Sequence, residues 1–107
     1  MSEIAYTVAV TFADAGMAEA WLNWLREGHV AEVLAGGASS AIVVALDAPA
    51  HSYEVRYRFP SREAFEHYER EYSPRLRAEG LRLFPLDKGV RYSRTLGAVC
   101  DVFLKTS

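Results

Sequence analysis

The sequence predicts an α+β sandwich of ferredoxin-like topology, and three observations carry this prediction. Strand-type and helix-type patterns follow one another in the order βαββαβ within 107 residues. The strand-type segments are short and alternating or apolar, whereas the helix-type segments are longer and have a period of three to four. This order gives a four-stranded antiparallel sheet with both helices on one face. The expected strands are 4–12, 39–46, 52–59 and 90–96, and the expected helices are 15–34 and 61–79.

The first strand and the first helix have the clearest patterns. Apolar side chains alternate with Thr or Ala from Ile4 to Phe12, which is typical of a sheet with one strongly apolar side. Asp14 is a good N-cap for the helix that follows. Gly28 predicts a kink or interruption in it, because glycine inside a helix costs about 1 kcal/mol relative to alanine. The expected buried stripe of this helix is Met17, Trp21, Trp24, Leu25 and Gly28.

The second half of the chain repeats the pattern with one break. Strand 39–46 is apolar on both faces, which indicates a strand covered on both sides. Ser61 is the expected cap of the second helix. The pair Ser73 and Pro74 is a new cap followed by proline at the first helical position, so this helix should break and restart there. Gly80 is the expected end of the restarted helix.

Composition limits the classes of function. The chain is short enough to form one domain, residues 1–107. A net charge of −2 gives no electrostatic footprint for nucleic acid or for an anionic membrane. The single cysteine, Cys100, excludes an intrachain disulfide and fits a reducing compartment. With neither a signal-peptide pattern nor an apolar run of about 20 residues, we expect a cytoplasmic protein without nucleic-acid or membrane partners.

Two apolar segments predict a homodimer. Strand 39–46 has apolar residues on both faces, and the tail 98–104 is apolar although the four-stranded sheet is already complete. Two such sheets packed face to face about a two-fold axis would bury both segments. The alternative is a monomer whose tail folds back over its own sheet.

The first helix carries a resemblance to a known family. Residues 21–34 fit the pattern W-x-x-W-[LM]-x-x-x-H-[IV]-x-E-[VM]-[LM], and they resemble a family of small bacterial proteins of unknown function in the dimeric α/β barrel superfamily. The strand 53–57 and the turn 76–78 resemble that family too, and the likeness spans residues 6–95. It implies a homodimer whose two sheets form a barrel, and it implies no established activity. The superfamily includes cofactor-independent monooxygenases, haem-degrading enzymes and small-ligand sensors, so the fold alone does not decide the function.

His29 is the first candidate for chemistry. It follows Trp24 by just over one turn, where the first helix should meet the end of the sheet, and Glu32 lies three residues further on. An imidazole beside a carboxylate can act as an acid or a base near pH 7. The alternative is a structural histidine that caps carbonyls near Gly28 or pairs with Glu32.

Two arginines are the next candidates. Arg56 and Arg91 lie on the sheet face opposite the core in the expected strands. An arginine that points into a barrel could bind a carboxylate with two parallel hydrogen bonds. The alternative is an ion pair at the dimer interface, for instance between Glu54 and an arginine of the partner subunit. Since the fourth strand should pair with the first, Arg91 is expected near Thr7 or Thr11.

These observations give one leading function and two alternatives. Three scattered histidines and one cysteine show no metal-ligand spacing, and no nucleotide-binding or hydrolase motif is present. We therefore expect neither metal nor cofactor. The leading prediction is a module that binds a small molecule in the cleft between helices and sheet, near the end of the first helix, with His29 and Trp24 at its mouth. The alternatives are a monooxygenase-type enzyme with His29 as base and a purely structural or regulatory dimer. The candidate ligand-binding residues are His29, Trp24, Glu32, Arg56 and Arg91.

Overall fold

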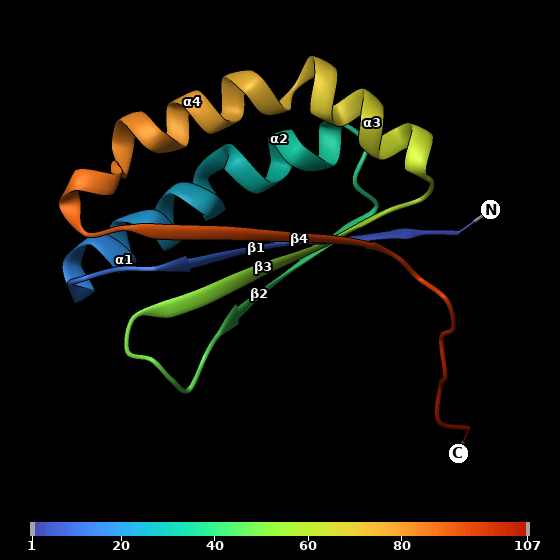
Figure 1. Ribbon diagram of the computed structural model, residues 1–107, viewed down its shortest axis with the longest axis horizontal. Helices are drawn as coiled ribbons and strands as arrows, with labels where there is room; N and C mark the ends of the chain where they lie inside the picture. The colour runs from blue at the N-terminus through green and yellow to red at the C-terminus, as the bar shows by residue number, and fades with distance from the viewer. Residues whose placement is uncertain (1, 107) are drawn as a thin grey trace.

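The sheet carries all its helices on one face (Figure 1), as the computed structural model shows for residues 2–106. The strand order is β2-β3-β1-β4, and every neighbouring pair is antiparallel. The predicted ferredoxin-like topology is therefore confirmed, with strand ends within two residues of those expected. The strands are β1 (Ile4–Thr11), β2 (Ser40–Ala45), β3 (Ser52–Phe59) and β4 (Arg91–Ala98).

Strand register decides which side chains face the helices. Tyr6 of β1 lies opposite Tyr57 of β3, and Val10 lies opposite Tyr92 of β4. This row faces the helices and forms much of the core, in which Phe59 is fully buried. The alternate residues form the other face, which we call the outer face and which no helix covers (Figure 1).

The edge strand β2 is less covered than its sequence predicts. Val43 pairs with Val55 on the helix side, whereas Ile42 pairs with Arg56 on the outer face. Ile42 is 60% exposed and Val43 is 44% exposed. The expectation that β2 is covered on both sides is therefore wrong within one chain.

The first helical segment is interrupted where glycine predicts it. It consists of α1 (Ala15–Trp24), the single π-helical turn η1 (Leu25–His29) and α2 (Val30–Ala35). Asp14 caps α1 as predicted, since its Oδ1 accepts a backbone N–H of the first turn at 2.8 Å. Gly28 has φ 158° and ψ −24°, a conformation that other residues rarely adopt. The interruption therefore coincides with the one residue that permits it.

The second helical segment breaks as predicted, but Tyr72 rather than Ser73 is the N-cap of its second part, and the segment ends later than expected. It consists of α3 (Arg62–Glu71) and α4 (Ser73–Leu83), and the Oγ of Ser61 accepts a backbone N–H of α3 at 3.1 Å. The expectation that Gly80 ends α4 is wrong. A Cβ at Gly80 would lie 3.4 Å from the ring of Trp24, so glycine lets α1 approach α4 closely. Packing against this ring outweighs the helix penalty of about 1 kcal/mol.

The chain ends in an exposed tail. A single 3₁₀ turn, η2 (Leu86–Lys88), leads into β4. After β4 the backbone N–H of Val99 donates to the carbonyl of Glu3 at 2.9 Å, and the chain then runs away from the helices (Figure 1). Phe103 and Leu104 are 89% and 84% exposed. Among residues 2–106 there is no helix with both the length and the apolar character needed to cross a membrane.

Candidate functional site

A cavity lies between the helix layer and the sheet, and we call it the inner cavity. Its volume is about 120 Å³, and it is lined by residues of β1, β3, β4, α1, η1, α3 and α4. Its mouth lies between α4 and β4, where the lining residues Leu81 and Arg94 are exposed. Most of the lining is aliphatic or aromatic. The polar groups on it belong to His29, Arg77, Arg94, Tyr6, Tyr57, Tyr68 and Tyr92.

The π-helical turn places His29 against Trp24. The two rings are stacked, with centroids 3.9 Å apart and planes 20° from parallel. In a regular α-helix two residues five apart would point about 140° away from each other. The wider turn of η1, closed by a hydrogen bond from the N–H of Val30 to the carbonyl of Leu25, is what brings them together.

Trp24 is held in place from α4. Its Nε1 donates to Oε1 of Glu79 at 3.0 Å, and its ring packs beside Gly80. A hydrogen bond to a charged acceptor is among the stronger ones in proteins. The indole is therefore a fixed support for the imidazole rather than a mobile side chain.

His29 is neutral at physiological pH. Burial lowers the pKa of its imidazole to about 4, although the carboxylates of Glu79 and Glu32 oppose the shift. A neutral imidazole has one N–H donor and one acceptor nitrogen. Its Nδ1 is buried and has no hydrogen-bond partner within the described chain.

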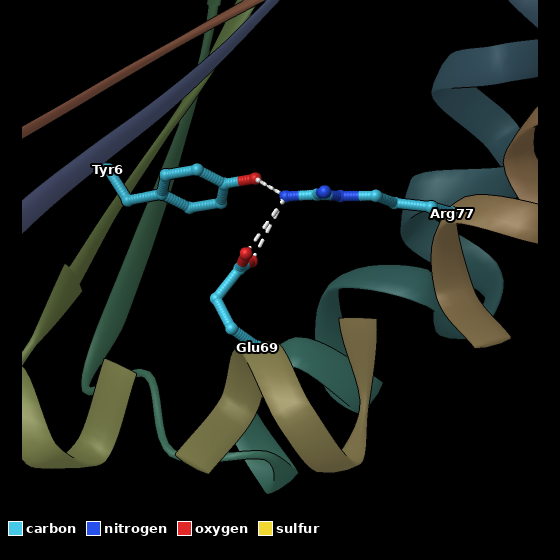
Figure 2. A network of polar contacts seen from close by, with 3 residues as sticks. All are labelled: Tyr6, Glu69 and Arg77. Carbon is cyan, nitrogen blue, oxygen red and sulfur yellow. Dashed lines mark hydrogen bonds and ion pairs between the residues drawn. The ribbon is translucent and has the colours of Figure 1, made fainter. Parts of the chain in front are cut away.

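Arg77 of α4 also lines the inner cavity. Its Nη2 donates to the hydroxyl of Tyr6 at 3.3 Å and to the carboxylate of Glu69 at 3.0 and 3.3 Å (Figure 2). Its Nε is buried and has no partner among residues 2–106. The guanidinium is thus anchored through one nitrogen only.

Three tyrosines of the inner cavity, Tyr57, Tyr68 and Tyr92, keep their protons at neutral pH, because burial raises the pKa of each. Burial raises the pKa of Tyr57 well above its usual range, and the neighbouring Tyr68 and Tyr6 add to the shift. Burial raises the pKa of Tyr68 to about 12, and the neighbouring Tyr6 adds to this shift. Tyr92 donates its hydroxyl proton to the carbonyl of Phe84 at 2.7 Å. Phenol hydroxyls are therefore donors in this cavity and not bases.

A second hollow lies on the other side of His29, and we call it the outer groove. Its volume is about 260 Å³. Trp24, His29 and Leu76 line both the inner cavity and the outer groove. Glu27, Glu32 and Glu79 also line it, yet no group of three His, Cys, Asp or Glu within residues 2–106 is arranged to hold a metal ion.

The structure brings together three of the five candidate residues. Trp24, His29 and Glu32 meet at the outer groove, where Glu32 also forms an ion pair with Arg75 at 2.9 Å. Arg56 lies on the outer face of the sheet and forms an ion pair with Glu54 at 2.8 Å. Arg91 lies on the same face, opposite Thr11 as expected. Within one chain, these two arginines are on the opposite side of the sheet from His29.

Two other arginines occupy the cavity instead. Arg94 lies on the helix side of β4, two residues from Tyr92, and strand alternation could have identified it. Arg77 has no comparable signal. The break between α3 and α4 changes the phase of the helix, so the face that carries Arg77 cannot be extrapolated from Phe65 and Tyr68.

The comparison with protein families agrees with the resemblance of the first helix. Residues 3–99 match the family described as "Domain of unknown function (DUF4286)". The chain belongs to the DUF4286 family. No relative of the DUF4286 chain is found among curated proteins.

Solved structures share the fold of this DUF4286 protein at low identity. A dimeric ferredoxin-like protein from an uncultured marine organism has a TM-score of 0.73 and 12% identity, covering 96% of this chain and 100% of that one. SnoaB, a cofactor-independent oxygenase from Streptomyces nogalater, has a TM-score of 0.70 and 13% identity, covering 98% and 100%. Rv0793 from Mycobacterium tuberculosis has a TM-score of 0.65 and 20% identity, covering 94% and 98%. At these identities the likeness concerns the fold.

Proposed function

We propose that this protein binds a small organic molecule in the inner cavity and that His29 contacts it. The observation that carries the proposal is that His29 lines a cavity while its buried Nδ1 has no hydrogen-bond partner within residues 2–106. More than nine in ten buried polar groups in proteins are hydrogen-bonded. A bound molecule that hydrogen bonds to this imidazole supplies the missing partner.

The shape and lining of the inner cavity limit that molecule. The volume of about 120 Å³ is below the roughly 300–1,000 Å³ of pockets for drug-sized ligands. The walls supplied by Val10, Trp21, Leu25 and Val55 are apolar. The proposed ligand is therefore a single small compound with an apolar body and few polar groups.

The same proposal includes a homodimer formed through the outer faces of two sheets. Ile42 on the outer face and the tail residues Val102, Phe103 and Leu104 are apolar and mostly exposed, and contact with a second copy would remove them from water. Two solved structures with this fold are described as dimeric. In this dimer Arg56 and Arg91 lie at the interface rather than at the ligand.

The test of the binding function uses phenol, which is uncharged at neutral pH. Titration of the ¹⁵N-labelled full chain should shift the amide resonances of β1, η1 and α4 together. His29→Gln should weaken binding by about tenfold, the value of one lost hydrogen bond. His67→Gln, an exposed histidine on α3, is the matched control and should bind phenol like the parent.

An enzyme of the cofactor-independent oxygenase type is the second candidate. It is favoured by the neutral imidazole beside the cavity and by the likeness of the fold to SnoaB. His29 would take a proton from the substrate, and the resulting anion would be oxidised by O₂. The imidazolium form of His29 has a pKa of about 4, so His29 is a weak base and can remove protons only from acidic substrates. We therefore favour ligand binding over enzyme activity. Oxygen uptake with nitrophenols, lost in His29→Gln, would establish turnover.

The third function, a purely structural or regulatory dimer, makes the opposite prediction. It leaves the inner cavity without a specific occupant, so phenol would bind the parent and His29→Gln equally or bind neither. Either result would contradict the proposed binding function. The oligomeric state, measured separately by light scattering, does not depend on this outcome.

A further inference from the structure

We propose that the molecule bound in the inner cavity is a small organic monoanion, with its carboxylate held by Arg77 and Arg94. This inference rests on the proposed function, because it names the class of ligand for the same cavity. It concerns the part of the lining that α4 and β4 supply. None of the residues that line the cavity is an aspartate or a glutamate.

The hydrogen bonding of Arg77 is incomplete in a way that points to a missing acceptor. Its bonds to Tyr6 and Glu69 all use Nη2 (Figure 2). Nε carries a proton, is buried and has no partner in the described chain. A guanidinium has five donors in a rigid plane that matches the two oxygens of a carboxylate. A ligand carboxylate that hydrogen-bonds to this guanidinium would supply a further acceptor.

The charge balance around the cavity also favours an anion. Glu69 compensates Arg77 from outside the lining. Arg94 forms no ion pair within residues 2–106, and its guanidinium lies 6.0 Å from the centre of the Tyr92 ring. These three side chains leave one uncompensated positive charge. A ligand with one negative charge would compensate this charge.

The remaining polar groups suit the same ligand. The hydroxyl of Tyr6 accepts a hydrogen bond from Arg77, so its own proton is available to donate. Tyr57 lines the cavity beside it and stays protonated at neutral pH. Trp24 and Leu25 supply apolar lining, and His29 lines the cavity with them. Donors beside apolar surface describe a carboxylate attached to an apolar or aromatic body.

Matched acids and amides test this inference on the full-length protein. Benzoate and benzamide have the same shape, as do hexanoate and hexanamide, and only the acid of each pair is charged at neutral pH. Calorimetric titration should give a Kd for the acid that is lower than that of its amide by about 10- to 100-fold, the effect of charge-assisted hydrogen bonds.

Three variants locate the effect. Arg94→Gln should remove most of the preference for the acid, and Arg77→Lys should reduce it, because lysine keeps the charge but loses the planar fork. Neither should change the Kd of the amide by more than about twofold. Arg82→Gln removes the same charge from an exposed position of α4 outside the cavity and should behave like the parent. Circular dichroism and the melting temperature check that each variant folds.

The outcomes separate this inference from the proposed function. If acid and amide bind equally well while still perturbing the cavity resonances, the anion inference is overturned and the binding function stands. If Arg82→Gln lowers the preference as much as Arg94→Gln does, the effect is one of net charge and the inference is overturned. If neither acid, amide nor phenol perturbs the cavity, the binding function fails, and the inference fails with it.

Discussion

The helix side and the outer face of the sheet are built from the same four strands, but only the helix side is covered by residues of its own chain. On the helix side Ile4 and Val10 of β1 are about 1% exposed. On the outer face Thr7 and Ala9 of the same strand are half-buried, although no helix covers them. Strand alternation separates the two faces, but it does not state what covers the outer one.

This difference separates two kinds of stability. Burial on the helix side is intramolecular, so it should not depend on protein concentration. Apolar groups on the outer face and in the tail, such as Ile42 and Phe103, are mostly exposed in one chain. If a second copy buries them, their contribution follows mass action. Substitutions on the helix side and on the outer face should therefore differ in how their effects depend on protein concentration.

The largest effect is expected for a fully buried side chain on the helix side. Phe59 is 0% exposed, and Phe59→Ala should lower the free energy of unfolding by about 3–5 kcal/mol at every protein concentration. Arg56→Ala, at an exposed ion pair on the outer face of the same strand, should change it by less than about 0.5 kcal/mol. Urea unfolding at two protein concentrations measures both, and equal losses would contradict the assignment of the faces.

Charge on the outer face of β2 should weaken the proposed dimer. Val44 lies opposite Glu54, so Val44→Asp places two carboxylates side by side and desolvates them in the dimer. We expect the Kd of the dimer to rise by at least about 100-fold, or about 2.7 kcal/mol. Val43→Asp on the helix side of the same strand is the control and should leave the Kd nearly unchanged. Light scattering across a dilution series that finds no difference would contradict a dimer formed through the outer faces.

Truncation of the tail should have a smaller effect that depends on concentration. A chain ending after Val99 keeps the whole of β4 and its hydrogen bond to Glu3. If the tail crosses the partner, loss of Phe103 alone removes about 1.5–3 kcal/mol of apolar burial. The melting temperature of the truncated chain should fall, and it should fall more at low protein concentration. A truncated protein that melts like the parent at all concentrations would show that the tail contributes nothing to the dimer.

Acid should destabilise the helix side through His29. Its pKa is about 4 in the folded chain against an ordinary value of 6.5, so between these values the unfolded chain binds a proton that the folded chain does not. Stability is therefore lost as the pH falls below 6.5, by about 2 kcal/mol between pH 7 and pH 5. His29→Gln should lose this slope in urea unfolding, and His67→Gln should keep it. An unchanged slope in His29→Gln would contradict the burial of the neutral imidazole.

Local signals in the sequence predict the framework of the fold accurately. Several local predictions agree with the structure: the bounds of β3, the caps Asp14 and Ser61, and the break next to Ser73. Each of these features depends on neighbouring residues alone. The predicted end of α4 does not agree with the structure. Gly80 lies inside this helix because Trp24, which is distant in sequence, packs against it, and no local signal reports that contact.

The candidate site was predictable only in part. Trp24, His29 and Glu32 lie on one helical segment, so their proximity follows from spacing in the sequence. The arginines of the inner cavity, Arg77 and Arg94, come from two further elements. Alternation along β4 puts Arg94 on the same side as Tyr92, but Arg94 was not among the predicted site residues. The position of Arg77 depends on how α4 is rotated after the break, and tertiary packing sets that rotation.

The wall between the inner cavity and the outer groove is a single layer of side chains, since Trp24, His29 and Leu76 line both hollows. If a molecule binds in the inner cavity as proposed, side chains and not the backbone limit its length. A longer molecule gains room if Trp24 turns aside, at the loss of its hydrogen bond to Glu79, a bond of the kind worth about 1.5–3 kcal/mol. In family members without a carboxylate at the position of Glu79, the tryptophan between the two hollows would be held less firmly. For the proposed ligand, the hydrogen bond between Trp24 and Glu79 would therefore set how far a molecule can extend from the inner cavity into the outer groove.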